Sequence, residues 1–221
     1  FLLSVSLDLR TPLTSIRGYA EAFSDGAADD PARAARVIAG EAQRLERLVG
    51  DLLDLARLDV DRFDLHPVAA DLVDVVGGVV AGLEPEVADA GLTLRQRLDD
   101  TTPVVVHVDV DRVSQILANL VTNAISFART TVWITVRADA GTGIVEVADD
   151  GPGIPAAALP HVFDRLYQAD NQPARRGRGT GLGLAIVAER CTRMGGRCDV
   201  ASVEGTGTTF SARFPLTDPE V

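Results

Sequence analysis

Residues 143–154 read GIVEVADDGPGI, a strand-like run that ends in two carboxylates and continues into two glycines. A strand over 143–148 places Asp149 at the strand end. A carboxylate buried there can accept a hydrogen bond from an exocyclic amine, and it favours adenine over guanine because guanine presents a carbonyl at that position. A plain β-turn is the alternative, since Asp and Gly favour turns for backbone reasons.

Two asparagines upstream have the spacing of one helical turn. Asn119 and Asn123 are four residues apart in a helix predicted over 111–128, so both amides project from the same face. Asparagine carbonyl oxygens suit Mg²⁺ when phosphates and water complete its shell. The alternative is a pair of polar residues on a solvated helix face.

A glycine-rich stretch, GTGLGL at 179–184, lies at the start of a helix predicted over 181–194. Backbone amides left open by glycine at a helix start bind anions such as a polyphosphate. The spacing fits neither the dinucleotide fingerprint nor, without a lysine, a P-loop, and a flexible hinge is the alternative. A second stretch, GTGTTF at 205–210, predicts a tight hairpin.

The composition excludes several classes of protein. The 221 residues are 46% hydrophobic and 24% charged, which is ordinary for a globular chain of one or two domains. Acidic residues outnumber basic ones 32 to 21, and the formal charge of -11 disfavours binding to nucleic acid. All 21 basic residues are arginine, so chemistry that requires a lysine is excluded. Two cysteines are too few for a disulfide scaffold and indicate a reducing compartment.

Residues 1–62 predict a helical hairpin. Apolar residues recur every three or four positions over 2–23 and over 38–55, and Pro31 suits the first turn of the second helix. About 60 residues are too few for a stable core, so we predict that two copies pair into a four-helix bundle and form a homodimer. The expected stripes comprise Leu2, Val5, Leu9, Leu13, Ile16, Ala20 and Phe23, then Ile38, Ala42, Leu45, Leu48, Leu52 and Leu55.

From residue 63 to residue 221 the pattern changes to short β-branched runs separated by helical stretches. This mixture predicts an α+β sandwich with helices on one face of a mixed sheet. The expected strands are 92–98, 103–108, 131–138, 143–148 and 208–214, and the expected helices are 72–90, 111–128 and 181–194. Residues 169–179 are expected to form a mobile loop.

The order and separation of these motifs resemble the cytoplasmic core of a sensor histidine kinase of a bacterial two-component system. That family joins a dimerisation and phosphotransfer hairpin, here 1–62, to a catalytic ATP-binding domain of the gyrase, chaperone and histidine-kinase superfamily, here 63–221. The resemblance covers essentially all 221 residues. The matching boxes are 6–13 (phosphoacceptor), 119–123 (asparagine), 149–153 (first glycine), 163–167 (phenylalanine), 179–183 (second glycine) and 205–207 (third glycine).

The resemblance implies that the second domain binds ATP and Mg²⁺. Asn119 and Asn123 would hold Mg²⁺ and phosphates, Asp149 would bind the adenine amine, and a lid would run from about 156 to 178. Ser126 stands where such kinases usually carry a lysine or arginine, so an arginine of the lid is expected to replace that phosphate contact. The other residues implied to bind the nucleotide are Gly151, Gly153, Phe163, Arg176, Arg178, Gly179, Gly181, Gly183, Leu184 and Thr208.

Leu7 is the largest departure from the family, because it stands where the phosphate-accepting histidine is expected. At 100° per residue, position 7 lies about 150° from the centre of the apolar stripe and shares an outward face with Thr11, Thr14 and Gly18. Leucine has no lone pair for a phosphoryl group, so we expect no autophosphorylation there. An engineered change, a naturally degenerate kinase and a surface substitution without consequence are the possible explanations.

The resemblance gives Asp8 an acid/base role beside the absent imidazole, and gives Thr11 the placement of a water that dephosphorylates a response regulator. The parent function is then ATP-dependent phosphorylation of a histidine and transfer to an aspartate on the receiver domain of a response regulator. The chain is expected to be a cytoplasmic fragment that reaches the cell membrane only through an upstream segment. A non-enzymatic pseudokinase scaffold and a conformational ATPase of the same superfamily are the alternatives.

Overall fold

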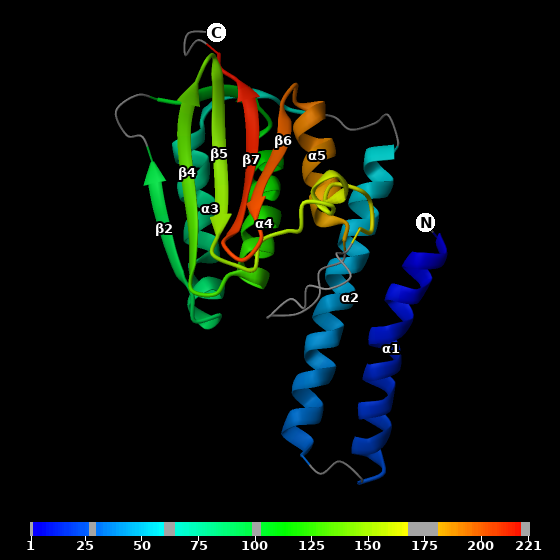
Figure 1. The fold of residues 1–221 in the computed structure, drawn as a ribbon. Coiled ribbons are helices and arrows are strands. Elements are labelled where there is room, and N and C mark those ends of the chain that lie inside the picture. The colour runs from blue at the N-terminus through cyan, green and yellow to red at the C-terminus, as the bar shows by residue number, and fades with distance from the viewer. Residues whose placement is uncertain (1, 27–29, 60–64, 99–102, 168–180, 218–221) are drawn as a thin grey trace. The chain divides into compact units, whose positions relative to one another are not determined.

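The computed structural model describes residues 2–26, 30–59, 65–98, 103–167 and 181–217. The chain divides into two compact units, Phe1–Arg62 and Phe63–Val221, each with its own internal packing (Figure 1). Within the described ranges, no helix combines the length and the apolar character that crossing a membrane requires.

The first unit is a helical hairpin, as predicted. Helix α1 (Leu2–Ser24) continues through Pro12 without a break, and helix α2 (Pro31–Asp59) returns alongside it (Figure 1). Pro12 in α1 and Ala34 and Leu48 in α2 are buried. The two helices therefore bury a narrow apolar seam against each other.

Several large apolar side chains of the hairpin are exposed. Leu13 and Phe23 in α1 are 54% and 57% exposed, and Val49 and Leu53 in α2 are 47% and 53% exposed. Leu13 and Phe23 belong to the predicted apolar stripe, so a single hairpin covers that stripe only in part. Exposed large apolar side chains of this kind are available to pack against a partner.

The second unit contains a five-stranded mixed sheet with three helices packed on one of its faces (Figure 1). The strands are β2 (Thr93–Leu98), β4 (Thr131–Asp139), β5 (Thr142–Asp149), β6 (Arg197–Val203) and β7 (Gly207–Pro215), and the helices are α3 (Leu72–Asp89), α4 (Val110–Phe127) and α5 (Gly183–Arg193). The strand order is β2-β4-β5-β7-β6, with β2 and β4 parallel and the other neighbours antiparallel. The predicted sandwich of helices on a mixed sheet is confirmed.

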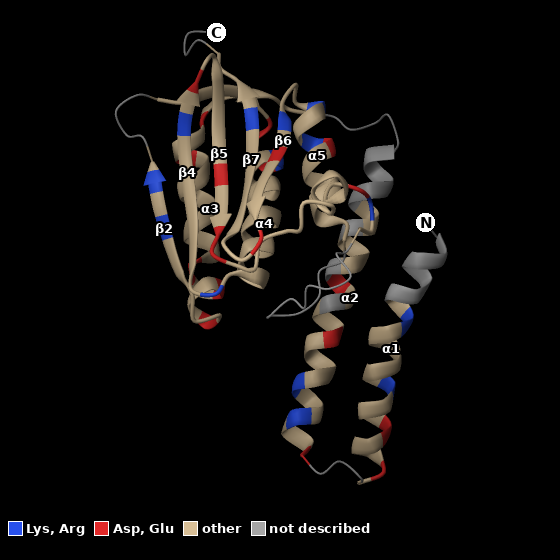
Figure 2. Cartoon of the chain, in the orientation of Figure 1, with Lys and Arg blue, Asp and Glu red and all other residues tan. Residues whose placement is uncertain are grey.

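Alternation along β4 explains which face of the sheet is covered. Val132, Ile134 and Val136 are buried against the helices, and the residues between them point to the opposite face. On that opposite face Arg137 binds Glu146 of the neighbouring strand at 2.8 Å. Figure 2 shows charges of both signs on neighbouring strands. Ion pairs across strands thus replace apolar packing where no helix covers the sheet.

Two strands are missed by the sequence patterns. β1 (Val68–Asp71) pairs antiparallel with β3 (Val105–Val108) in a separate two-stranded sheet, and β6 forms one edge of the main sheet. β1 has only four residues, and β6 reads RCDVASV, which lacks a run of β-branched residues. The strand expected over 103–108 corresponds to β3, so it lies in the two-stranded sheet and outside the main sheet.

Candidate functional site

Asp149 is the last residue of β5 and is only 7% exposed. Its Oδ1 accepts a hydrogen bond from the Gly151 amide at 2.7 Å, and the backbone of Thr208 on β7 also donates to the carboxylate. Burial raises the pKa of Asp149 to about 6; the charge of Asp150 adds to the rise, and the bonds from Gly151 and Thr208 oppose it. Asp149 is therefore a buried acceptor that becomes fully ionised only above pH 6.

The next carboxylate has a different environment. Asp150 accepts hydrogen bonds from the backbone amides of Arg129, Thr130 and Thr131 at 2.8 to 3.2 Å, and from the Thr130 hydroxyl. Partial burial alone would raise the pKa of Asp150, but these hydrogen bonds outweigh it and lower the pKa to about 2. Asp150 therefore stays ionised and anchors the loop between α4 and β4.

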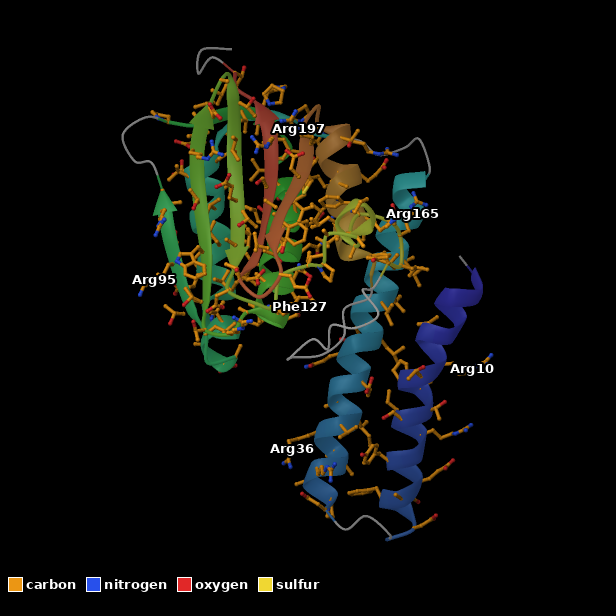
Figure 3. The ribbon with its side chains drawn as sticks, viewed as in Figure 1. Arg10, Arg36, Arg95, Phe127, Arg165 and Arg197 are labelled. Carbon is orange, nitrogen blue, oxygen red and sulfur yellow. The ribbon has the colours of Figure 1, made fainter. Side chains whose placement is uncertain are left out.

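The glycines after the two carboxylates are required by close backbone contacts. A Cβ on Gly151 would lie 2.8 Å from the Phe127 carbonyl oxygen, and one on Gly153 would lie 2.1 Å from the Val203 carbonyl oxygen. Gly153 also has φ +71°, which residues with side chains rarely adopt. Figure 3 shows Phe127 at the end of the sheet where β5 finishes. The backbone after β5 thus passes close to α4 at Gly151 and to the β6–β7 turn at Gly153, where no side chain fits.

Thr208 lies beside Asp149 in the sheet and is also buried. Its hydroxyl is 2.9 Å from that of Ser202, which donates to the Gly207 carbonyl and accepts from the Ile154 amide. Ser202 therefore connects residues 151–154 to the β6–β7 hairpin. Sequence reasoning missed Ser202, and its place opposite Thr208 in the hairpin predicted at 205–210 was the available signal.

Helix α4 carries the two asparagines, and both side chains are partly exposed. The Asp109 carboxylate caps the helix by accepting a hydrogen bond from the Arg112 amide at 3.1 Å. The Asn119 Cγ lies 4.0 Å from the position that a Cβ on Gly183 would occupy. The structure therefore brings the first asparagine and the glycine at the start of α5 together.

Ser126, the departure from the family pattern on the same helix, makes a local contact. Its hydroxyl donates to the carbonyl of Thr122 at 2.9 Å. A hydroxyl bound back to its own helix is a typical arrangement for serine in a helix interior. Ser126 is therefore bound within α4 and does not replace the phosphate contact of a lysine or arginine.

The two ends of the glycine-rich loop before α5 are joined at its base. The Leu166 amide donates to the Gly181 carbonyl at 2.9 Å, and both residues have positive φ, +63° and +71°. A Cβ on Gly181 would lie 2.9 Å from the Leu166 carbonyl carbon. Arg176, Arg178 and Gly179, which the sequence predicts to bind the nucleotide, lie outside the described residues, as does the whole of the loop expected over 169–179.

Phe163 and Leu184 flank this loop and are partly buried against the hydrophobic core. The Phe163 ring meets Phe210 of β7 edge to face, with ring centroids 6.0 Å apart. Aromatic pairs in this geometry are favourable beyond the area they bury. The observed contacts of Phe163 therefore attach the start of the loop to the sheet.

The remaining candidates lie in the hairpin. Leu7 and Asp8 belong to α1, and their side chains lie outside the described part of the structure. Thr11, Thr14 and Gly18 are exposed. Because these positions share a helix face with position 7, that face is directed away from the seam between α1 and α2.

Within the ranges that the structure describes, no three His, Cys, Asp or Glu side chains gather where they could hold a metal ion. Amide oxygens are a separate class of ligand, and they suit Mg²⁺ when it is carried by phosphates. Asn119 and Asn123 are therefore the candidate metal ligands of the second unit.

The fold and this site define an ATP-binding domain of the class shared by histidine kinases, DNA gyrase B and HSP90. The family described as histidine kinase-, DNA gyrase B-, and HSP90-like ATPase matches residues 108–218, and the His Kinase A (phospho-acceptor) domain matches residues 1–60. The chain belongs to the histidine kinases of two-component signal transduction.

Curated relatives extend along the whole chain. Sensor histidine kinase MtrB of Mycolicibacterium paratuberculosis is 38% identical over 220 residues, which are 98% of this chain and 39% of MtrB. Sensor histidine kinase WalK of Bacillus subtilis is 33% identical over 227 residues, which cover 100% of this chain and 37% of WalK. The chain therefore spans about two fifths of the length of these relatives.

Solved structures agree with the fold. Full-length ShkA in complex with AMPPNP has a TM-score of 0.71 at 26% identity, over 100% of this chain and 46% of ShkA. Histidine kinase AdeS of Acinetobacter baumannii has a TM-score of 0.76 at 24% identity, over 96% of this chain and 98% of AdeS. The second likeness concerns the fold alone.

Proposed function

We propose that this chain is the cytoplasmic core of a sensor histidine kinase that binds ATP with Mg²⁺ in its second unit. The observation that carries the proposal is Asp149, a buried carboxylate at a strand end, followed by two glycines, Gly151 and Gly153, at which close backbone contacts leave no room for a side chain. A buried carboxylate acceptor fits a base that donates through an exocyclic amine. ShkA, a relative by fold, was solved with the nucleotide AMPPNP, which supports a ligand of this class.

Different residues at the end of the sheet would bind different parts of the nucleotide. Asp149 accepts the hydrogen bond of the adenine amine, while Gly151, Gly153 and Thr208 border the base. Asn119 and Asn123 supply amide oxygens to Mg²⁺, and the amides at the start of α5 bind phosphate oxygens beside Asn119. The bound ATP and Mg²⁺ supply an activated γ-phosphoryl group, and the described residues orient it.

The loop that contains 168–180 is proposed to act as a lid over the phosphates. Its base is held by the Leu166–Gly181 hydrogen bond and by Phe163 on the core. Arg176 or Arg178 would bind a phosphate in place of the cation that Ser126 does not provide. Gly179 would add a bare backbone amide to the same anion site.

ATP affinity is expected to fall as the pH drops below 6. The ionised Asp149 accepts the hydrogen bond of the adenine amine more strongly than the neutral acid does, and its pKa is about 6, so the affinity at pH 5 should be roughly 10-fold lower than at about pH 7.5. Calorimetric titration of the 221-residue chain with ATP and Mg²⁺ measures this. Titration with Mg²⁺ and tripolyphosphate, which has no base, corrects for protonation of the phosphates. No heat with ATP at either pH would refute the nucleotide site, and equal pH dependence of both ligands would refute the role of Asp149.

The hairpin is proposed to be the dimerisation and phosphotransfer domain. In the parent reaction a histidine at position 7 accepts the phosphoryl group, Asp8 orients its imidazole, and an aspartate of a response regulator receives the group. With Leu7 this chain would bind ATP without the first transfer. A water placed by Thr11 would still allow removal of phosphate from a response regulator. ThkA, which shares the fold at a TM-score of 0.77, was solved in complex with its response regulator TrrA.

Replacing Leu53 with aspartate is expected to weaken homodimer formation. Leu53 and Val49 are apolar and about half exposed in the single hairpin, as expected for side chains that a second copy covers. In a symmetric dimer Leu53→Asp places a negative charge at two equivalent positions of the interface, so the dimer dissociation constant should rise at least ~10-fold.

Sedimentation equilibrium of the 221-residue chain gives the dissociation constant directly. Gln43→Asp is the matched control, because it adds the same charge at an exposed polar position of α2. If both variants dimerise equally weakly, or if the unaltered chain is a monomer, then exposed Val49 and Leu53 do not serve the homodimer.

A further inference from the structure

Asp150 binds one loop through both carboxylate oxygens. Its Oδ1 accepts from the amides of Arg129, Thr130 and Thr131 at 2.8, 3.0 and 3.2 Å, and its Oδ2 accepts from Thr130. Three consecutive amides directed at one carboxylate form a strong anchor, because each bond is assisted by the negative charge. This anchor joins the end of β5 to the segment that leaves α4.

The anchored loop is connected to the other parts of the site. The Arg129 guanidinium donates to the Gly205 carbonyl at 3.1 Å in the β6–β7 turn, and the Gly205 amide donates to the Pro152 carbonyl at 2.6 Å. The Phe127 carbonyl at the end of α4 contacts the backbone of Gly151. Asp150 therefore completes a closed set of contacts that joins the end of α4, residues 151–153 and the β6–β7 turn.

We infer that Asp150 is a positioning residue for the nucleotide: its hold on residues 129–131 sets the distance between the asparagines of α4 and Asp149 of β5. The inference rests on the proposed function, in which the asparagines hold the phosphates and Asp149 holds the base. One rigid ligand spans both groups, so an error in their separation weakens its binding even when each group is intact. The pKa of about 2 keeps Asp150 ionised wherever ATP binding is measured.

A double-mutant cycle of ATP binding tests this inference with Asp150→Asn, Asn119→Ala and the double variant. Asparagine is close in shape to aspartate but lacks the charge and one acceptor oxygen. We expect Asp150→Asn to weaken ATP binding roughly 10-fold when Asn119 is present and less than ~3-fold when Asn119 is already removed. Asp139→Asn is the matched control, because Asp139 is an exposed carboxylate at the opposite end of β4, and it should leave ATP affinity unchanged.

A merely structural role predicts another outcome. If Asp150→Asn costs the same factor with and without Asn119, or does not change ATP affinity, the inference is wrong. The pH profile gives an independent readout: the charge of Asp150 contributes to the raised pKa of Asp149, so in Asp150→Asn the loss of ATP affinity should begin at a lower pH.

Thr130→Val provides a milder test should Asp150→Asn not fold. It removes the hydroxyl bond to Asp150 and keeps the three amide bonds, so the same dependence on Asn119 is expected with a smaller factor. Additive effects of Thr130→Val and Asn119→Ala would overturn the inference. If the unaltered chain fails to bind ATP, the nucleotide site itself is refuted, and this outcome is distinct from additivity in a chain that binds.

Discussion

Replacing Asp149 with asparagine is expected to weaken ATP binding strongly without loss of the fold. The carboxylate is the acceptor proposed for the adenine amine, and the amide of asparagine would place a donor against that donor. The loss of one charge-assisted hydrogen bond together with an unpaired buried donor should weaken ATP binding roughly 100-fold. Calorimetric titration with ATP and Mg²⁺ measures the loss, and Asp139→Asn, an exposed carboxylate on the neighbouring strand, is the control.

Asp149→Asn also has an expected effect on the free energy of unfolding. The folded chain binds a proton at Asp149 with a pKa of about 6, whereas the pKa of an unperturbed aspartate is 3.8, so protonation of this group stabilises the fold. That contribution is complete below pH 3.8 and is lost as the pH rises through about 6. At neutral pH the buried charge therefore opposes folding, and neutral asparagine should leave the free energy of unfolding equal or higher.

Urea unfolding of both chains at neutral pH and at about pH 4 measures this difference. A variant that binds no ATP and is also strongly destabilised at neutral pH would contradict the account of Asp149. In that case the carboxylate would serve the hydrogen bonds of Gly151 and Thr208 rather than a ligand.

Replacing Leu7 with histidine is expected to create autophosphorylation in a chain for which we expect none. An imidazole nitrogen supplies the lone pair that leucine lacks, so the bond from the γ-phosphorus to ADP can break as the bond to nitrogen forms. Thr11, Thr14 and Gly18 on the same helix face are exposed, which leaves room for an approaching nucleotide. The expected change is from no detectable label to acid-labile label on the chain.

Incubation of the 221-residue chain with γ-labelled ATP and Mg²⁺ measures this gain. Leu7→Gln controls for polarity without a nucleophile, and Leu7→His combined with Asp149→Asn should lose the label again because ATP no longer binds. Acid-labile label on the unaltered chain would show that another residue is the acceptor. A Leu7→His variant that binds ATP and stays unlabelled would favour the pseudokinase scaffold.

The alternatives to a kinase core make different predictions in the same assays. A pseudokinase scaffold binds ATP but gains no label with Leu7→His. A conformational ATPase releases phosphate steadily without a response regulator and does not depend on position 7. The hairpin of α1 and α2 and its match to the His Kinase A (phospho-acceptor) domain favour the kinase core.

Much of the fold was predictable because its elements have strong periods. The helices α1 and α2 follow apolar stripes, and β4 and β5 follow β-branched alternation around a tight turn. β1 and β6 were not predictable, because their pairing with β3 and β7 comes from neighbours in space rather than from their own residues. Leu13 and Phe23 repeat with the apolar stripe, but within one hairpin they remain exposed.

The available chemistry can be read from the residues alone: a chain without lysine, two asparagines one helical turn apart, paired carboxylates before glycines, and a leucine without a lone pair at position 7. The different environments of the paired carboxylates become visible only in the folded chain. Asp149 is buried beside Thr208 and its pKa rises to about 6, whereas Asp150 meets three amides of another segment and its pKa falls to about 2. Desolvation and hydrogen bonding depend on residues that are distant in sequence, and two adjacent identical side chains do not share these neighbours.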